Sequence, residues 1–246
     1  MPSRSRRKAS SFPFGAPSPS ALTPKERAII QRYRTPFLVQ RFLNSIPYNH
    51  EVRKETLRSF REVIRHGTAH CLEAALVAAV ILEQHGYPPL LLSFDSADDL
   101  GHVALLFRRG KRWGAVARSR DAGLHGRKPI FRTVRHLALS YFDPYVDLTG
   151  RLTGYAVADL YDLGSYDWRF SPKNIWKVEH YLLEMSHRPI RSSEARYRRL
   201  LGEYRAFKEK FPNRQATYYR NRSQWMEAGV DPKARQLLGI RRSPSR

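Results

Sequence analysis

Residues 66–86 read HGTAHCLEAALVAAVILEQHG, and this stretch decides the fold. From Cys71 to about Gln84 nearly every residue is a strong helix former, and apolar side chains occur on all sides of the predicted helix. A helix that is apolar all round is enclosed by other layers of a protein. Gly86 and the two prolines at 88–89 end it. The stretch therefore predicts a buried helix that begins at the single cysteine of the 246-residue chain.

The pattern changes after this helix. LLLSF at 90–94 predicts a strand, and DSADDLG predicts an acidic loop. HVALLFR at 102–108 and WGAVARS at 113–119 predict two further strands that pair as an antiparallel hairpin. Residues 120–130 predict a loop and residues 131–142 a helix. The order of one buried helix and three strands predicts an α+β fold with antiparallel strands.

Helices are also predicted on both sides of this core. TPKE at 23–26 has the capping-box arrangement and begins a helix that extends to about Leu43, with Pro36 as the place where it can bend. Ser192 or Ser193 begins a second helix, which Pro212 ends. The sequence therefore predicts five parts in chain order: a disordered basic tail at 1–22, an N-terminal helical arm at 23–66, the core at 67–160, a basic C-terminal helical region at 161–240 and a frayed tail at 241–246.

The formal charge is +22, from 44 Lys and Arg against 22 Asp and Glu. The excess lies in the flanks, because residues 1–66 and 161–246 each have a net charge of +10 and residues 67–160 have +2. Basic flanks give affinity for polyanions, and solvated basic helices explain them equally well. A role in binding an acidic partner, a polyanion or nucleic acid through these flanks therefore stays open as one alternative.

The sequence also allows an expectation of where in the cell the protein is found. No apolar run approaches the ~18 residues of a membrane-spanning helix. The basic residues near the N-terminus are followed by a Pro/Ser stretch, where a signal peptide has its apolar segment. One cysteine forms no internal disulfide, so nothing ties the chain to an oxidising compartment. We expect a cytoplasmic protein without membrane insertion.

The chemistry of the core centres on Cys71. A helix N-terminus lowers the pKa of a thiol, and the thiolate is the nucleophile. His102 begins a strand directly after Gly101, so it can supply the base that a covalent mechanism needs. Backbone amides at the helix start are the natural donors to an oxyanion. His66 and His70 have no further ligands around them in the sequence, and we predict neither a metal nor an organic cofactor.

The motifs GTAHCLEAA, GHVALLF and WGAVARSRD resemble the transglutaminase-like cysteine superfamily. Residues 40–160 are similar to uncharacterised bacterial transglutaminase-like domain proteins. The resemblance implies a papain-like core in which Cys71 is the nucleophile and His102 the general base and acid. It also implies a carboxylate on the adjoining strand that orients the histidine.

This third position departs from the pattern of the superfamily, which usually has Trp, two or three residues, and then Asp-Pro. Here Ala117 stands four residues after Trp113, and Asp121 stands eight after it. Three alternatives follow: Asp121 acts from a shifted position, Ser119 orients the imidazole as a neutral acceptor, or the triad is degraded. We favour Asp121.

The sequence therefore predicts thiol-dependent acyl transfer or hydrolysis on a peptide, a protein or a small amide or ester. Water as the acceptor gives a hydrolase or peptidase, and an amine gives a cross-linking enzyme. Two alternatives come from other classes. One is a catalytically inactive transglutaminase-like domain that acts as a binding scaffold, and the other is the polyanion-binding protein described above.

Overall fold

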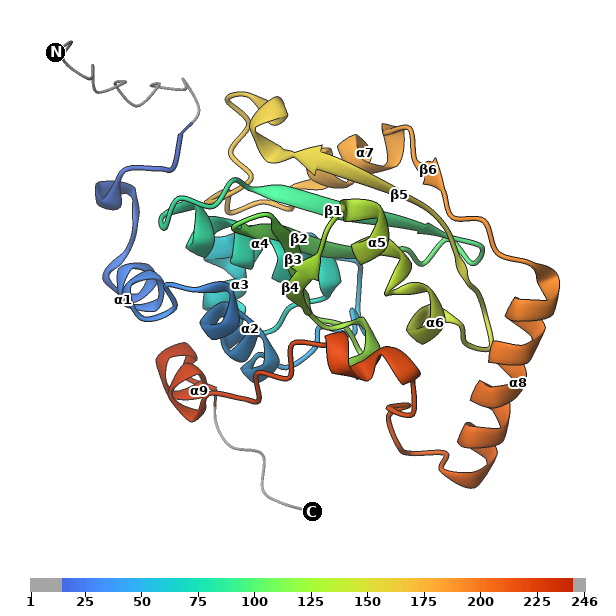
Figure 1. The fold of residues 1–246 in the computed structure, drawn as a ribbon. Helices are drawn as coiled ribbons and strands as arrows, with labels where there is room; N and C mark the ends of the chain where they lie inside the picture. Colours follow the sequence, from blue (N-terminus) through green and yellow to red (C-terminus); the bar gives the residue numbers. More distant parts are fainter. Residues whose placement is uncertain (1–14, 241–246) are drawn as a thin grey trace, which may run out of the picture.

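An antiparallel sheet with helices on both faces forms the centre of the computed structural model, which describes residues 15–240 (Figure 1). Within these residues the sheet has six strands in the order β4-β3-β2-β1-β5-β6. Their bounds are β1 Leu90–Ser96, β2 His102–Arg109, β3 Arg112–Val116, β4 Arg127–Phe131, β5 Leu152–Asp159 and β6 Arg188–Pro189. The predicted hairpin of the second and third strands is confirmed, because β2 and β3 pair antiparallel with Leu105 opposite Val116.

Helix α4 (Cys71–Glu83) is the buried helix that the sequence predicts, and it packs against β2. Its residues from Leu72 to Glu83 are all buried. Side chains of alternate strand positions, such as Leu91 and Leu105, face it in one hydrophobic cluster. Five more helices contribute to this cluster: α1 Pro24–Arg32, α2 Pro36–Ser45, α3 Phe60–His66, α7 Trp176–Glu184 and α9 Pro232–Leu238.

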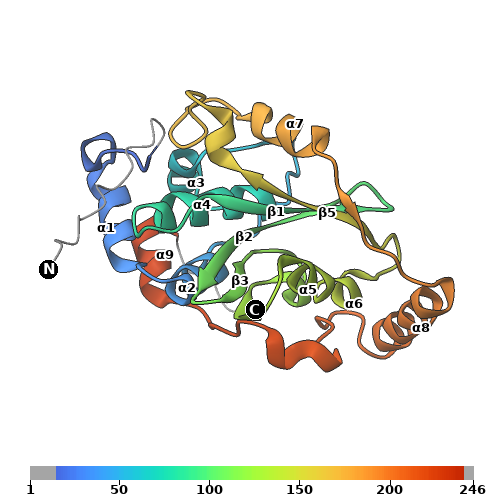
Figure 2. The ribbon, with the colours of Figure 1, turned by 45° about the horizontal axis from the view of Figure 1, so that its top comes forward.

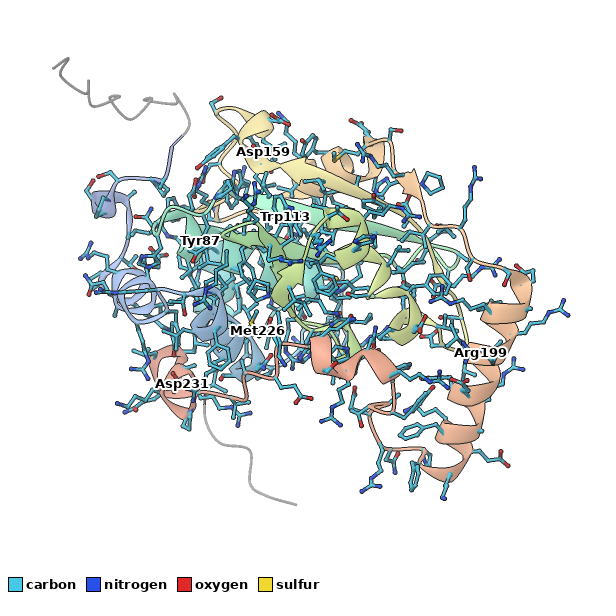
Figure 3. The ribbon with its side chains drawn as sticks, viewed as in Figure 1. Tyr87, Trp113, Asp159, Arg199, Met226 and Asp231 are labelled. Carbon is cyan, nitrogen blue, oxygen red and sulfur yellow. The ribbon has the colours of Figure 1, made fainter. Side chains whose placement is uncertain are left out.

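The other face of the sheet is covered by a second hydrophobic cluster. The intervening strand positions, such as Leu92 and Leu106, belong to it, as the period of two in a strand requires. The helices on this side are α5 Val134–Leu139, α6 Phe142–Tyr145 and α8 Glu194–Lys210. Figure 2 shows the two helical layers on opposite sides of the sheet, with α8 at the margin of the second.

The predicted α+β fold, with a buried helix followed by antiparallel strands and with flanking helices, is confirmed. One predicted helix is divided, however. The helix expected from Thr23 to about Leu43 stops at Arg32, and α2 begins at Pro36. The residue before a proline is disfavoured in helical conformation, so Thr35 is extended and caps α2 through its side chain instead. The capping box of Thr23 and Glu26 is present as predicted.

Residues 127–131 were expected to belong to a loop and a helix start, and this expectation is wrong. They form β4, which pairs with β3 through Trp113 and Phe131. Gly126 and Pro129 are turn signals in the sequence, but an edge strand tolerates proline because one side of it needs no ladder hydrogen bond. The helix expected at 131–142 is accordingly reduced to α5 and the short α6.

Four short 3-10 turns occur among the described residues, and one of them, Ala122–Leu124, lies in the site. The other three lie at Pro19–Ala21, Leu160–Leu163 and Arg220–Gln224. The predicted tails at 1–22 and 241–246 fall largely on residues 1–14 and 241–246, which lie outside the described residues. Between residues 15 and 240 no helix is long and apolar enough to cross a membrane.

Candidate active site

The N-terminus of α4 presents Cys71 as its first residue. The chain before it is held by a short parallel pairing with residues 47–49. The Asn49 amide donates to the Ala69 carbonyl at 3.1 Å, and the Ala69 amide donates to the Pro47 carbonyl at 3.2 Å. This pairing places Tyr48 directly beside the start of the helix. The thiol is therefore fixed by backbone contacts on its N-terminal side and by the buried helix on the other.

His102 lies at the opposite wall of the site as the first residue of β2, and its side chain is buried. Its ring stacks on Phe94 with a centroid distance of 6.1 Å and lies 5.8 Å from the ring of Tyr141. These two aromatic residues belong to the second hydrophobic cluster, away from α4. His102 therefore lies at the end of its strand on the side of the thiol, and its side chain lowers the pKa of Cys71.

The outer ring nitrogen of His102 is held by the main chain. Its Nε2 lies 2.9 Å from the carbonyl oxygen of Leu124, in the 3-10 turn Ala122–Leu124. A carbonyl oxygen only accepts, so Nε2 carries a proton. In the neutral ring Nδ1 is then the unprotonated nitrogen, and it is the one left for the thiol. The Leu124 carbonyl thus fixes both the orientation and the tautomer of the His102 ring.

Neither of the two side chains predicted for this orienting role, Asp121 and Ser119, hydrogen-bonds to the His102 ring within the described residues. Asp121 lines the same cleft, but no hydrogen bond joins its carboxylate to His102 within the described residues. The Ser119 hydroxyl accepts from the Asp121 amide at 3.3 Å. Ala117 is buried, and its backbone is held on both sides by Gln40. The group that hydrogen-bonds to His102 Nε2 is therefore a backbone carbonyl, that of Leu124.

A buried arginine supports the turn that carries this carbonyl. Arg127 is fully buried, and its guanidinium donates to the carbonyls of Gly123 at 2.7 Å and His125 at 2.9 Å. It also donates to Ser140 and lies 3.8 Å from the ring centroid of Tyr141. Burial lowers the pKa of Arg127 to about 10, so the group stays charged near neutral pH. Arg127 thereby holds the carbonyls on either side of Leu124.

His70, directly before the thiol, is a second histidine of the site. Its Nε2 lies 3.0 Å from the Thr56 carbonyl and 3.7 Å from a carboxylate oxygen of Glu73. Burial opposes its protonation, but a hydrogen bond with Cys71 and the charge of Glu73 outweigh this and raise the pKa of His70 to about 9. His70 is therefore an imidazolium at neutral pH.

The Cys71 thiol is ionised in this environment. Burial alone would raise its pKa. Hydrogen bonds with His102 and His70, together with their positive charges, more than offset burial and lower the pKa of Cys71 to about 5. The pKa of Tyr48 moves the other way and is raised well above its usual value, by burial and by the negative charge of the neighbouring thiolate. The Tyr48 hydroxyl therefore keeps its proton.

The thiol opens into a cleft of ≈ 750 Å³. Residues from several distant segments line it, among them the acidic loop at 95–99, the loop at 119–124 and helix α7. Tyr204 of α8 and Tyr219 close it on the C-terminal side. A cleft of this size that contains an ionised thiol and two histidines has the features of a site for covalent catalysis.

The remaining candidate residues lie outside this arrangement or play a supporting part. His66 is half exposed and lies 3.5 Å from Glu62. His125 lies on the cleft loop, where its Nε2 is 2.9 Å from the Arg118 guanidinium and 3.1 Å from the Ser119 carbonyl. Burial and the charge of Arg118 lower the pKa of His125 to about 4, so it is neutral. Among residues 15–240 no three His, Cys, Asp or Glu side chains are grouped closely enough to hold a metal ion.

Sequence reasoning missed three groups of this site: Tyr48, Glu73 and the Leu124 carbonyl. Glu73 had a detectable signal, because a glutamate three residues after a helix cap completes a capping box. Tyr48 and Leu124 had no such signal, because each lies in a loop and the sequence does not predict how these loops run through the fold.

No family model matches the chain, and no curated protein matches it. Among solved structures, the chain is similar to LapG of Legionella pneumophila, with 13% sequence identity and a TM-score of 0.33. The match covers 60% of this chain and 89% of LapG. A likeness at this level carries no argument about chemistry, which rests on the geometry of the site.

Proposed function

We propose that this protein is a thiol-dependent acyl-transfer enzyme in which Cys71 attacks the carbonyl carbon of an amide or ester. The observation that carries the proposal is the position of the thiol: it lies at the N-terminus of a buried helix and opens into a cleft that His70 and His102 also line, and these two histidines lower its pKa. The resemblance of the sequence motifs to the transglutaminase-like cysteine superfamily supports the same roles for Cys71 and His102.

In the first half of the reaction the Cys71 thiolate forms a bond to the carbonyl carbon, and the electron pair of the C=O bond moves to the oxygen. The tetrahedral intermediate collapses when its bond to the leaving nitrogen or oxygen breaks, and the leaving group takes a proton from His102 Nδ1. The product of this half is a thioester on Cys71. Nε2 keeps its own proton throughout, because the Leu124 carbonyl holds it.

In the second half His102 Nδ1 takes a proton from water, and the hydroxide oxygen adds to the thioester carbon. Collapse releases a carboxylic acid and restores the thiolate and the protonated histidine. An amine in place of water gives a new amide and makes the same site a cross-linking enzyme.

Two groups beside the thiol suit the developing oxyanion. The Cys71 backbone amide lies at the positive end of α4, and the protonated Tyr48 hydroxyl lies next to it. His70 adds a fixed positive charge on the same side. Loss of one oxyanion donor lowers the rate by roughly 10²–10³-fold. Tyr48→Phe, which keeps the ring and removes only the hydroxyl, is therefore expected to lower the rate of acylation.

The first test follows alkylation of Cys71 by iodoacetamide against pH, with the modified residue identified by mass spectrometry. We expect the rate to rise through an apparent pKa near 5 and to be constant above it. Cys71→Ala removes the only thiol of the chain and serves as the blank. A thiol that reacts only as the pH approaches that of an unperturbed cysteine, about 8.5, would overturn the proposal.

The second test uses 4-nitrophenyl acetate, which releases a coloured product on acylation. We expect a burst of one product molecule per protein and an acetyl group on Cys71 that is then lost to water. His102→Gln removes the burst, whereas His136→Gln, on the exposed surface of α5, keeps it. Acetyl groups on lysines without any on Cys71 would contradict the proposed reaction.

The same assay separates the candidates for the orienting group. Because neither side chain bonds to His102, Asp121→Asn and Ser119→Ala are each expected to lower the rate by less than about tenfold, compared with about 10⁴ for a carboxylate that fixes the tautomer of a catalytic histidine. A loss near 10⁴ in Asp121→Asn would assign the orienting role to Asp121 after all.

A further inference from the structure

The walls of the cleft differ in charge from the rest of the protein. The chain has twice as many basic as acidic side chains, 44 against 22. Among the described residues, however, the cleft around Cys71 is lined by eight Asp and Glu and by one Arg, Arg120. More than a third of all carboxylates of a strongly basic protein thus line one cleft, whose low-dielectric walls focus their field.

Several of these carboxylates have no partner that would neutralise them. The side chains of Glu55, Asp99, Asp121 and Glu179 make no hydrogen bond or ion pair with other described residues. Burial raises the pKa of Asp121, and the negative charge of Asp147 adds to the rise although Arg120 opposes it. The ionised form of Asp121 therefore lies in an unfavourable environment, which a positively charged ligand would relieve.

The carboxylates are distributed along the cleft and do not converge on one point. They come from separate segments, including the loop at 51–55, the loop at 95–99, Asp147 and α7. The absence of any close group of three ligating side chains in residues 15–240 argues against a single metal ion as the occupant. Carboxylates spread in this way match a chain that carries its positive charges at intervals.

Helix α7 shows how such a chain would be held. Trp176, Glu179 and Leu183 are spaced three and four residues apart and line the cleft from one face of the helix. Leu183 is a large apolar side chain that is 71% exposed. A lysine or arginine side chain has an apolar stem and a charged head, so the aromatic and aliphatic groups suit its stem and Glu179 suits its head.

We infer that the acyl substrate of this site is a basic peptide segment, with lysine or arginine side chains near the carbonyl that Cys71 attacks. The inference rests on the proposed function and deepens it, because it names the class of substrate. The carboxylates draw the positively charged segment into the cleft and hold it along α7, so that its backbone carbonyl comes to the thiolate.

The test measures how the charge of a small reagent affects its reaction with Cys71. Three methanethiosulfonates are compared, carrying a trimethylammonium group, a sulfonate group or only a methyl group. In each case the thiolate forms a mixed disulfide and expels methanesulfinate. For each thiol we take the ratio of the rate with the cationic reagent to the rate with the anionic reagent. We expect this ratio to be at least tenfold higher for Cys71 than for free 2-mercaptoethanol, and we expect high salt to remove the difference. Without the carboxylates, the imidazolium of His70 would favour the anionic reagent.

Two double variants, each lacking two negative charges, provide the matched comparison. Asp121→Asn with Glu179→Gln changes the cleft, whereas Glu184→Gln with Glu209→Gln changes exposed positions on α7 and α8 outside it. We expect the cleft variant to lose most of the preference for the cationic reagent, measured as the ratio of its rates with the cationic and the neutral reagents. The control variant keeps the preference.

The outcomes separate this inference from the proposed function. A thiol that reacts readily with the neutral reagent but shows no more charge preference than 2-mercaptoethanol overturns the inference and leaves the proposed function standing. Equal losses of preference in both double variants also overturn it, because the effect would then come from net charge. Failure of the neutral reagent below about pH 8.5 overturns the proposed function itself.

Discussion

A glutamate is buried at each end of α4, and the two glutamates have different hydrogen-bond partners. At the C-terminal end, Glu83 accepts two hydrogen bonds from the Arg169 guanidinium, at 2.9 and 2.6 Å. At the N-terminal end, Glu73 is fully buried and accepts from neutral donors: the amides of Arg58 and His70 and the side chains of Thr56 and Asn49. Its nearest guanidinium nitrogen, on Arg58, is 4.0 Å away.

The difference shows how one helix serves both the fold and the site. The charge of Glu83 is neutralised locally by a partner, so it affects only the packing of the loop that carries Arg169. The charge of Glu73 is held in place by dipoles and acts on His70, which in turn acts on the thiol. Substitutions at the C-terminal end should therefore change stability alone, and those at the N-terminal end should change the thiol.

The largest effect is expected from Glu83→Ala. Removal of the buried carboxylate leaves the partly buried Arg169 guanidinium without its partner, which destabilises the protein by about 3–5 kcal/mol. Urea unfolding measures this loss. The rate of alkylation of Cys71 in the folded protein should stay as in the unmodified chain. The double variant Glu83→Ala with Arg169→Met should recover much of the stability, because no unpaired charge is left. A shift in the pKa of Cys71 in either variant would show that the two ends are coupled.

His102→Gln is expected to have the next largest effect, at the N-terminal end. Loss of the imidazole removes the larger of the two histidine contributions that lower the pKa of the thiol, so this pKa rises from about 5 toward its ordinary value. At about pH 6 the thiolate population, and with it the alkylation rate, should fall by roughly 10²-fold. The matched variant His136→Gln should leave the rate unchanged. A fall of less than about threefold would assign the low pKa to His70 and the helix terminus instead.

Glu73→Gln tests the glutamate at the site directly. The amide keeps the shape of the side chain but replaces one accepting oxygen by a donating NH₂, so two of its hydrogen bonds are lost at a cost of about 2 kcal/mol. Loss of the negative charge lowers the pKa of His70 from about 9 toward 6.5. Proton NMR of the histidine rings during a pH titration measures this shift. If the pKa of His70 stays near 9, Cys71 and not Glu73 maintains its charge.

The smallest effects are expected in the dependence of stability on pH. The folded state lowers the pKa of Cys71 to about 5, so the stability that this group contributes is present above the ordinary thiol pKa and is lost as the pH falls through about 5. The folded state raises the pKa of His70 to about 9, so its contribution is present below about 6.5 and is lost as the pH rises through about 9.

The free-energy difference between the unmodified chain and Cys71→Ala should therefore grow from about pH 5 to pH 9. The difference for His70→Gln should shrink between about pH 6.5 and pH 9. Urea unfolding at constant ionic strength measures both. Parallel pH profiles for the two variants would contradict the opposite signs of the two shifts.

Much of this fold could be predicted because its signals are local. The apolar run after Cys71, the caps at Thr23 and Ser193 and the stop at Gly86, which has a left-handed φ of 82°, each act within a few residues. The edge strand β4 was missed because its proline and glycine have the composition of a loop, and only pairing with β3 makes the segment a strand. The signal for the break of the first helix, Pro36, is local too. A proline allows either a bend or a stop of the helix, and tertiary packing decides between them.

The sequence by itself determined that a lone cysteine begins a buried helix and that a histidine begins a nearby strand. Both predictions depend on the pattern of apolar side chains in neighbouring residues, which is local. Only the tertiary structure decided what holds that histidine. The group is the carbonyl of Leu124. Because every residue has the same backbone carbonyl, the type of side chain at position 124 does not predict this contact. Only the tertiary structure, likewise, made an acidic cleft in a basic protein. Its carboxylates are scattered from residue 51 to residue 179, and their common field exists only where the folded chain brings these segments together.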